Sequence, residues 1–310
     1  MRATQRSPLV SVILPTYNRA HTLLRAVNSV LNQGYREIEL IVVDDASTDG
    51  TAALLEGIAD LRLRIIRHDR NKGVATARNT GIFCASGQLI AFQDSDDEWL
   101  HGKVEKQLDK IEGAGQDCVL VYCTKIIYGR DEKRKRGRRR IACVPPPDET
   151  ELRGDMREVM SRTTSISPQT MLIRRDALLK IGGFDERIYG SEEWDLAFRL
   201  AQLGTFEFVD EPLVNTYLQP DSISNINPRA AYSLLIIYNK MKRAGVPNSI
   251  QAQRWASLGN SLARMGHPAR GDKLLRAAIA ARPLSIGIWA RFIASILLWR
   301  IRRGSQYGSL

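Results

Sequence analysis

Along the first hundred residues, short continuous apolar runs alternate with apolar positions spaced as on one face of a helix. These runs are rich in Val, Ile and Leu and predict strands, most of which are buried. The segments between them predict amphipathic helices that end at glycine or begin near Ser and Asp. The predicted strands are 9–14, 38–43, 63–67 and 89–92, and the predicted helices are 20–32, 51–59 and 73–85. Strands that alternate with helices indicate an α/β fold with a mostly parallel sheet.

After residue 93 the pattern becomes looser. The later predicted helices are 99–113, 176–181 and 194–203, and the later predicted strands are 118–122 and 165–174. Residues 130–147 are basic and then rich in proline, which predicts a loop. Helical spacing then resumes near residue 227, and its breaks are Gly245-Val246-Pro247, Gly266-His267-Pro268 and Pro283. We therefore expect an α/β domain over residues 1–225 and a helical region over residues 226–310.

Charge separates the same two parts of the chain. Of the 310 residues, 44% are hydrophobic and 25% are charged, which is typical of a soluble folded protein. Residues 226–310 carry 14 Lys/Arg and one acid, Asp272, whereas residues 1–225 carry 31 Lys/Arg and 33 acids. This asymmetry predicts an anionic partner for the tail, a membrane or a nucleic acid, unless the charges only form a solvated face.

Cysteine usage and the start of the chain predict a cytoplasmic protein. The four cysteines show neither CxxC spacing nor histidine partners at zinc spacing, so we expect reduced thiols. Residues 1–8 are polar and lead directly into a predicted strand, so no signal peptide is expected.

An acidic cluster gives the first indication of chemistry. Asp94, Asp96 and Asp97 directly follow the predicted strand 89–92. Three carboxylates this close repel one another, and a hard cation such as Mg²⁺ or Mn²⁺ would relieve that repulsion. A solvated turn before a helix is the alternative. The segments 15–18 and 44–45 also end predicted strands, and ligands bind at such ends in α/β sheets.

Six segments occur in an order that identifies a family. They are VSVILPTYN at 10–18, IVVDDASTDGT at 41–51, NKGVATARNTG at 71–81, DSDDEW at 94–99, GGFDE at 182–186 and SEEWDL at 191–196. Together they closely resemble the family 2 glycosyltransferases, inverting enzymes with the GT-A fold. The resemblance covers about residues 8–225 and implies a glycosyltransferase catalytic domain there.

The resemblance implies roles for individual residues. The implied nucleotide and donor ligands are Pro15, Thr16, Tyr17, Asn18, Asp45, Arg78 and Asp94. Asp96 is the implied metal ligand, and the implied cofactor is Mn²⁺ or Mg²⁺. Tyr17 can stack on a base, although a half-buried loop aromatic is the alternative. Arg78 fits either a fork for phosphate or base, or a structural ion pair with a site aspartate.

The resemblance also implies a general base at Glu193. The family places it second in a Glu-Asp pair, whereas this chain has Glu192-Glu193, and the extra methylene moves the carboxylate by about 1.5 Å. An acidic pair that only stabilises a helix start is the alternative. Trp194 and Asp97 join Glu192 as implied acceptor-side residues, although Asp97 also fits a loop brace.

A second departure lies at residues 217–224. Many family members have Arg and His in this stretch, whereas this chain has Leu218 and Gln219. If that histidine normally helps to bind diphosphate or metal, its role here is weakened or moves to another residue.

The tail contains an apolar segment, 286–301, that is interrupted by Arg291 and Arg300 and is too short to span a bilayer. Its tryptophans and flanking arginines suit a helix lying in a membrane interface, with packing on the catalytic domain as the alternative. A nucleic-acid partner is disfavoured because no recognition motif is present.

We therefore expect a metal-dependent glycosyltransferase that uses a nucleotide-diphosphate sugar, and the expected donor is a UDP-sugar. Its acceptor would be a saccharide or lipid-linked hydroxyl in surface polysaccharide or glycolipid synthesis, at the inner face of the cell membrane. An inactive sugar-nucleotide-binding or scaffolding protein with the same fold is the alternative.

Overall fold

A computed structural model describes residues 7–130, 139–145, 152–162, 166–218 and 228–307. The chain forms two compact units. The first comprises Met1–Glu186 and Glu192–Ser222, and the second comprises Arg187–Ser191 and Ile223–Leu310.

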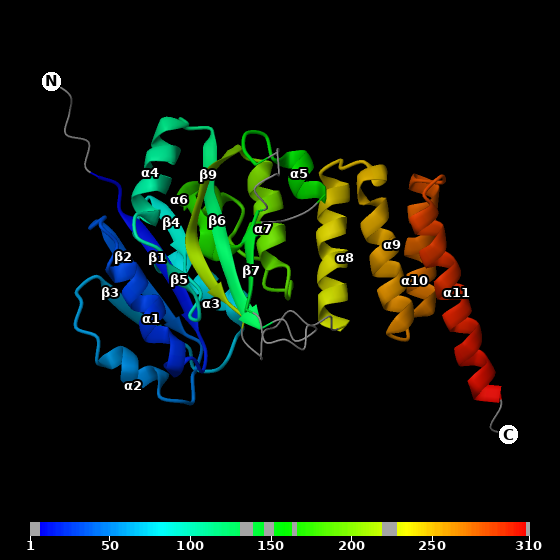
Figure 1. The fold of residues 1–310 in the computed structure, drawn as a ribbon, viewed down its shortest axis with the longest axis horizontal. Helices are drawn as coiled ribbons and strands as arrows, with labels where there is room; N and C mark the ends of the chain where they lie inside the picture. The colour runs from blue at the N-terminus through cyan, green and yellow to red at the C-terminus, as the bar shows by residue number, and fades with distance from the viewer. Residues whose placement is uncertain (1–6, 131–138, 146–151, 163–165, 219–227, 308–310) are drawn as a thin grey trace. The chain divides into compact units, whose positions relative to one another are not determined.

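The first unit is built on a nine-stranded mixed sheet (Figure 1). Its strands are β1 (Val10–Thr16), β2 (Ile38–Asp44), β3 (Leu63–Arg67), β4 (Leu89–Phe92), β5 (Glu98–Trp99), β6 (Cys118–Arg130), β7 (Arg139–Val144), β8 (Met171–Arg174) and β9 (Thr205–Tyr217). The order is β3-β2-β1-β4-β8-β6-β9-β5, with β7 paired to β6. The strands β3, β2, β1 and β4 are parallel, and β8 runs antiparallel to both of its neighbours. The α/β fold class expected from the sequence is confirmed.

Helices cover both faces of this sheet. The helices are α1 (Ala20–Leu31), α2 (Thr51–Glu56), α3 (Val74–Cys84), α4 (Lys103–Gly113), α5 (Arg157–Arg162), α6 (Arg175–Lys180) and α7 (Glu192–Ala201), with a 3-10 turn at Pro168–Thr170. Leu23 of α1 belongs to the buried cluster that contains Leu14 of β1. Gly81 of α3 instead lies against Ile13, where an added Cβ would be 2.5 Å from the isoleucine side chain. Because successive side chains of a strand point to opposite faces, α1 and α3 cover opposite sides of β1.

Some predicted boundaries were wrong for identifiable reasons. Pro15 does not end the first strand, which continues to Thr16. The Ile13 carbonyl accepts a hydrogen bond from the backbone N–H of Gln93, which lies just beyond β4. Pro15, two residues later on the same side, therefore faces no neighbouring strand, and its lack of a backbone N–H leaves no hydrogen bond unmade. The helix predicted from residue 99 begins at Lys103, because Glu98–Trp99 pairs with β9.

The largest differences lie in the second half of the sheet. The predicted strand 118–122 extends to Arg130, and the region predicted as a loop contains β7. Residue 165 of the predicted strand 165–174 lies outside the described residues. In the rest of that segment Pro168–Thr170 form the 3-10 turn, and only Met171–Arg174 pair. Neither β9 nor α5 was predicted. These elements depend on partners far away in the chain, so their local pattern is weak.

Over the residues that the structure describes, the second unit contains four helices, separated at the breaks that the sequence predicts. They are α8 (Pro228–Arg243), α9 (Asn248–Arg264), α10 (Pro268–Ala281) and α11 (Ile286–Tyr307). The helices α9 and α10 approach closely at two glycines, since a Cβ on Gly259 would lie 2.8 Å from the Gly271 carbonyl oxygen. Across the described parts of the chain, no helix combines the length and the apolar character needed to cross a bilayer.

Candidate active site

The carboxyl ends of three neighbouring strands bring the predicted site segments together. Thr16 pairs with Asp44 across β1 and β2, and Ile13 pairs with Phe92 across β1 and β4. The segments that follow these strands therefore begin at one edge of the sheet. This is the edge at which α/β proteins bind ligands.

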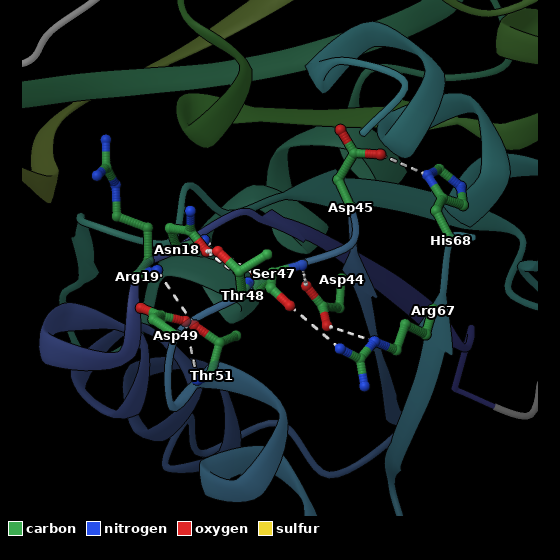
Figure 2. A network of polar contacts seen from close by, with 10 residues as sticks. All are labelled: Asn18, Arg19, Asp44, Asp45, Ser47, Thr48, Asp49, Thr51, Arg67 and His68. Atoms are coloured by element: carbon green, nitrogen blue, oxygen red, sulfur yellow. Dashed lines mark hydrogen bonds and ion pairs between the residues drawn. The ribbon is translucent and has the colours of Figure 1, made fainter. Parts of the chain in front are cut away.

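Hydrogen bonds join the loop after β1 to the loop after β2 (Figure 2). Asn18, with a left-handed φ of 52°, donates its backbone N–H to Ser47 Oγ at 2.9 Å and accepts a bond from Thr48 N–H at 2.8 Å. Asp49 accepts bonds from the backbone N–H groups of Ala20 and Thr51, at the starts of α1 and α2. The Asn18 side chain thus holds the loop in shape, while the adjacent Tyr17 is 44% exposed and available to a ligand.

The two aspartates after β2 point in opposite directions (Figure 2). Asp44 accepts a bond from Ser47 N–H and pairs with Arg67, so it braces the turn. Asp45 is buried and contacts His68 Nδ1 at 2.6 Å.

Asp45 also shapes the segment that leads into α3. It accepts bonds from the N–H groups of Lys72 and Gly73, each at 2.8 Å. Gly73 has a φ of 91°, a backbone conformation that favours glycine. One lone pair of Asp45 Oδ2 has no protein donor in these contacts, so a ligand N–H could still reach it.

The acidic cluster contains one internal brace and two partly exposed carboxylates. Asp97 is 2% exposed and accepts bonds from Gln169 Nε2 at 2.8 Å, Thr216 Oγ1 at 2.9 Å and Tyr217 N at 3.3 Å. Burial, together with the negative charges of Asp94 and Asp96, raises the pKa of Asp97 to about 8. Asp97 therefore braces the loop from within the protein, as one of its two interpretations has it, and its acceptor-side role stays a prediction.

Arg78 connects the acidic cluster to α7. Its buried guanidinium donates to Asp94 Oδ1 at 2.8 Å and to Glu192 Oε1 at 3.3 Å, and it lies 5.3 Å from the Phe184 ring centroid. Burial opposes the charge of Arg78, but the carboxylates of Asp94 and Glu192 outweigh it and raise its pKa. Of the two alternatives for Arg78, the structure has the ion pair with a site aspartate. Glu192 likewise pairs with Arg78 at a buried position.

Glu193 occupies the first turn of α7 and is partly exposed. Burial and the negative charge of Glu192 raise its pKa to about 7, although Arg78 and Lys125 act in the opposite direction. A carboxyl group that titrates near neutral pH can accept a proton from a hydroxyl under ordinary conditions. The acidic residues of this turn also stabilise the helix start, so both readings of the pair are physically compatible.

The next two residues of α7 are structural. Trp194 is 2% exposed and donates its indole N–H to the Met160 carbonyl at 2.6 Å, so it packs in the core, and its place beside an acceptor stays a prediction. Asp195 is fully buried and pairs with Arg199, which in turn donates to carbonyl groups before and within the Gly182–Glu186 turn. Because Trp194 and Asp195 lie on the packed face, the helix orientation is fixed.

Several residues of this region were not predicted as working together. Asn79 of α3 holds the turn at residues 182–186: its Oδ1 accepts from Phe184 N–H, and its Nδ2 donates to Phe184 O and Glu186 Oε1. Lys125 acts on Glu193 from β6. Gln93, fully buried beside the acidic cluster, has neither amide atom bonded within the protein. Its place between β4 and Asp94 was the only signal in the sequence.

The remaining predicted ligands lie at the same edge. Pro15 and Thr16 end β1, and the Thr16 hydroxyl is buried without a hydrogen-bond partner in the protein. Leu218, at the second departure from the family pattern, is 54% exposed. Gln219 lies outside the described residues.

The acidic cluster fits an open metal site better than a closed one. Within the described ranges, no three His, Cys, Asp or Glu side chains are grouped closely enough to enclose a metal ion. Mg²⁺ and Mn²⁺ commonly take only one or two carboxylates and fill other positions with phosphate oxygens. Asp94 and Asp96 are partly exposed. Their negative charges contribute to the raised pKa of Asp97, and a bound cation would offset this repulsion.

Comparison with known proteins agrees with this geometry. The profile described as Glycosyl transferase family 2 matches residues 11–182. A UDP-Glc:alpha-D-GlcNAc-diphosphoundecaprenol beta-1,3-glucosyltransferase of Escherichia coli is 45% identical over 100 residues, which cover 32% of this chain and 40% of that protein. A putative teichuronic acid biosynthesis glycosyltransferase of Bacillus subtilis is 44% identical over 108 residues, which cover 34% of this chain and 43% of that protein. The chain thus spans about two fifths of the length of these curated relatives.

Solved structures share the fold over nearly the whole chain. S. aureus TarS 1-349 in complex with UDP-GlcNAc has a TM-score of 0.71 at 20% identity and covers 96% of this chain and 92% of its own. A mannosyltransferase from Pyrobaculum calidifontis with GDP-Man and Mn²⁺ has a TM-score of 0.59 at 22% identity and covers 95% of this chain and 81% of its own. At these identities the likeness establishes the architecture, including a helical C-terminal part.

Proposed function

This chain belongs to glycosyl transferase family 2, and from that premise we propose that it transfers a sugar, with inversion, from a nucleotide-diphosphate donor to an acceptor hydroxyl. The observation that carries the proposal is the connection between Asp94 and Glu192 through Arg78, which ties the acidic loop to the turn that presents Glu193. A donor-side loop and a base-bearing helix are thereby held in one rigid arrangement.

In this proposal Glu193 accepts the proton of the acceptor hydroxyl. The hydroxyl oxygen forms its bond to the anomeric carbon while the bond from that carbon to the diphosphate oxygen breaks. The diphosphate leaves with the bonding electron pair, and the single in-line displacement inverts the anomeric centre. The pKa near 7 makes the ionised form of Glu193 available at neutral pH without making it a weak base.

The donor would bind along the carboxyl ends of β1, β2 and β4. Tyr17 offers an exposed ring for the base, and the free lone pair of Asp45 could accept a base N–H. Asp96, with Asp94 beside it, would hold a divalent metal, Mn²⁺ or Mg²⁺, that neutralises charge on the diphosphate when bound. Arg78 contacts Oδ1 of Asp94, so Oδ2 would remain available to the metal.

We propose UDP as the nucleotide and a lipid-linked saccharide as the acceptor, in the synthesis of a surface polysaccharide at the cytoplasmic face of a membrane. The support is by analogy: the E. coli relative is named for a UDP-Glc donor and a diphosphoundecaprenol acceptor, and the B. subtilis relative for teichuronic acid synthesis. Because GDP-Man occupies the archaeal neighbour, GDP is the first competing nucleotide to test.

Two observations favour a second candidate, a sugar-nucleotide-binding protein without turnover. Glu193 replaces the aspartate that the family motif leads us to expect. In addition, Arg78 is buried, and both of its terminal nitrogens already donate to carboxylates of the protein. Both candidates predict donor binding, and only the transferase predicts release of nucleoside diphosphate.

The test is thermal stabilisation of the purified protein by UDP, GDP, dTDP and CDP, each with and without Mn²⁺. A ligand at about 100 times its Kd stabilises the native state by about 2.7 kcal/mol, which shifts the melting temperature measurably. We expect a Mn²⁺-dependent shift with UDP that disappears in Asp96→Asn and persists in Asp155→Asn, an exposed control. No shift with any nucleotide would contradict both candidates, and a shift without nucleotide release from a UDP-sugar would favour the second.

A further inference from the structure

The first helix turns of α11 carry an apolar stripe that no other helix of the second unit covers. Its members are large hydrophobic residues with high exposure: Ile286 85%, Trp289 42%, Ile293 53% and Ile296 38%, with Leu284 at 95% in the turn that precedes the helix. At about 100° of rotation per residue, the four helical positions fall within an arc of about 80°. They therefore form one continuous stripe, which we call the α11 stripe.

The opposite side of α11 is buried, which explains why the stripe faces solvent. Ile288 is fully buried and Ser295 is 6% exposed, and both lie roughly opposite the stripe. Through that buried side α11 packs on α9 and α10 (Figure 1). The helix thus already has a core face, and the α11 stripe is a second apolar face that internal packing does not require.

Aromatic contacts hold the stripe in a defined shape. The Trp289 indole N–H donates to the Pro283 carbonyl at 2.8 Å, and its ring meets Phe292 edge-on at a centroid distance of 6.0 Å. Arg276 places its guanidinium 5.5 Å from the Phe292 ring centroid. A tryptophan with a bonded N–H, flanked by arginine, is typical of helices that lie at a membrane–water interface.

Charge decides between the possible occupants of this face. Residues 226–310 contain 14 Lys/Arg and a single acid, Asp272, which already pairs with Arg276. A second copy seated on the stripe through its own second unit would bring two strongly cationic units together without an acidic complement. An anionic lipid surface supplies both an apolar layer for the stripe and negative headgroups for the basic side chains.

We infer that the second unit docks on an anionic bilayer surface through the α11 stripe, with the helix lying in the plane of the interface. This inference deepens the proposed function, because docking would bring the protein to a lipid-linked acceptor. It rests on the described surface of the second unit and is tested by binding alone, so its failure is distinguishable from failure of donor binding.

The experiment measures binding of the full chain to two kinds of vesicle, phosphatidylcholine alone and phosphatidylcholine with about 30% phosphatidylglycerol. The anionic headgroups of the second kind attract nearby basic side chains. We expect binding only to the anionic vesicles and weaker binding as salt rises. Replacing Ile286 and Ile293 together by serine should weaken binding at least about tenfold, since each isoleucine contributes buried apolar area.

Matched controls separate the stripe from general effects of exposed apolar residues. Leu61 and Phe83 are 105% and 62% exposed and belong to the first unit. Replacing both by serine should leave vesicle binding unchanged, and the stripe variant should keep the melting temperature and nucleotide response of the parent protein. Light scattering of the parent protein without vesicles should show a monomer.

Three outcomes would overturn the inference. They are absence of binding to anionic vesicles, equal binding by the parent and the stripe variant, and a dimer in solution that the stripe variant loses. The last would assign the face to a second copy of the chain.

Discussion

Replacing Glu193 by glutamine should make the protein more stable and less active at the same time. Glu193 is the proposed base, and its surroundings disfavour its ionised form: burial and the Glu192 carboxylate raise its pKa from 4.5 to about 7. Glutamine keeps the size of the side chain and removes the charge. A site that disfavours its own functional charge is a common reason for active residues to reduce stability.

The magnitude follows from the pKa difference between the folded and unfolded states. Between about pH 4.5 and pH 7 the unfolded chain ionises Glu193 while the folded chain does not, so the wild type loses about 1.4 kcal/mol per pH unit. The full difference is about 3 kcal/mol above pH 7, and partial exposure of the side chain reduces it to about 2 kcal/mol. Below about pH 4.5 both states are protonated and the gain of the variant should vanish.

The assay is urea unfolding of wild type and Glu193→Gln at pH 4, 6 and 8, with Glu56→Gln as an exposed control. The free energy of unfolding of Glu193→Gln should exceed that of the wild type by about 2 kcal/mol at pH 8, by less at pH 6 and not at pH 4. Transfer by the same variant should fall by about 10²–10⁴-fold, and wild-type kcat/KM should rise about tenfold per unit towards pH 7 and then level off.

Two results would refute this reasoning separately. Equal stability of the variant and the wild type at pH 8 would mean that the environment of Glu193 does not disfavour its charge. Unchanged transfer by a variant that is more stable would mean that Glu193 is buried as described but is not the base.

The other predictions concern the ion pair, the turn and the donor loop. Arg78→Met should lower the free energy of unfolding by about 3–5 kcal/mol, because it leaves two carboxylates near each other without their cation, whereas Lys106→Met at an exposed pair should cost under about 1 kcal/mol; equal losses in denaturant titrations would contradict the assignment. Gly182 and Gly183 have φ of 75° and 70°, but only at Gly183 would a Cβ meet a side-chain oxygen, at 2.5 Å, so alanine there should cost about 2–4 kcal/mol against about 1 kcal/mol at Gly182. Tyr17→Ala should leave the melting temperature of the free protein unchanged and weaken UDP binding about tenfold by calorimetry, and unaltered affinity would remove Tyr17 from the donor site.

The sequence by itself determined the first part of the fold and which segments meet at the carboxyl edge of the sheet. The strands 63–67 and 89–92 were predicted with the bounds that the structure has. For 89–92 the reason is that a continuous apolar run between turn residues leaves few local alternatives. It also placed Asp45, Asp94 and Asp96 at one edge, since the carboxyl ends of parallel strands coincide. The helical tail and its breaks followed from periodicity and from glycine and proline.

Only the tertiary structure decided what the individual side chains do. Asp97 is a brace because Thr216, 119 residues later, and Gln169, 72 residues later, converge on it. Trp194 is a core residue because α5 packs against it. Strands such as β9 and contacts such as these depend on partners that are distant in the chain, and no local pattern encodes which of two acidic neighbours is buried. Asp94, Asp96 and Asp97 therefore look alike in the sequence, but differences in burial and in hydrogen-bond donors give them different roles.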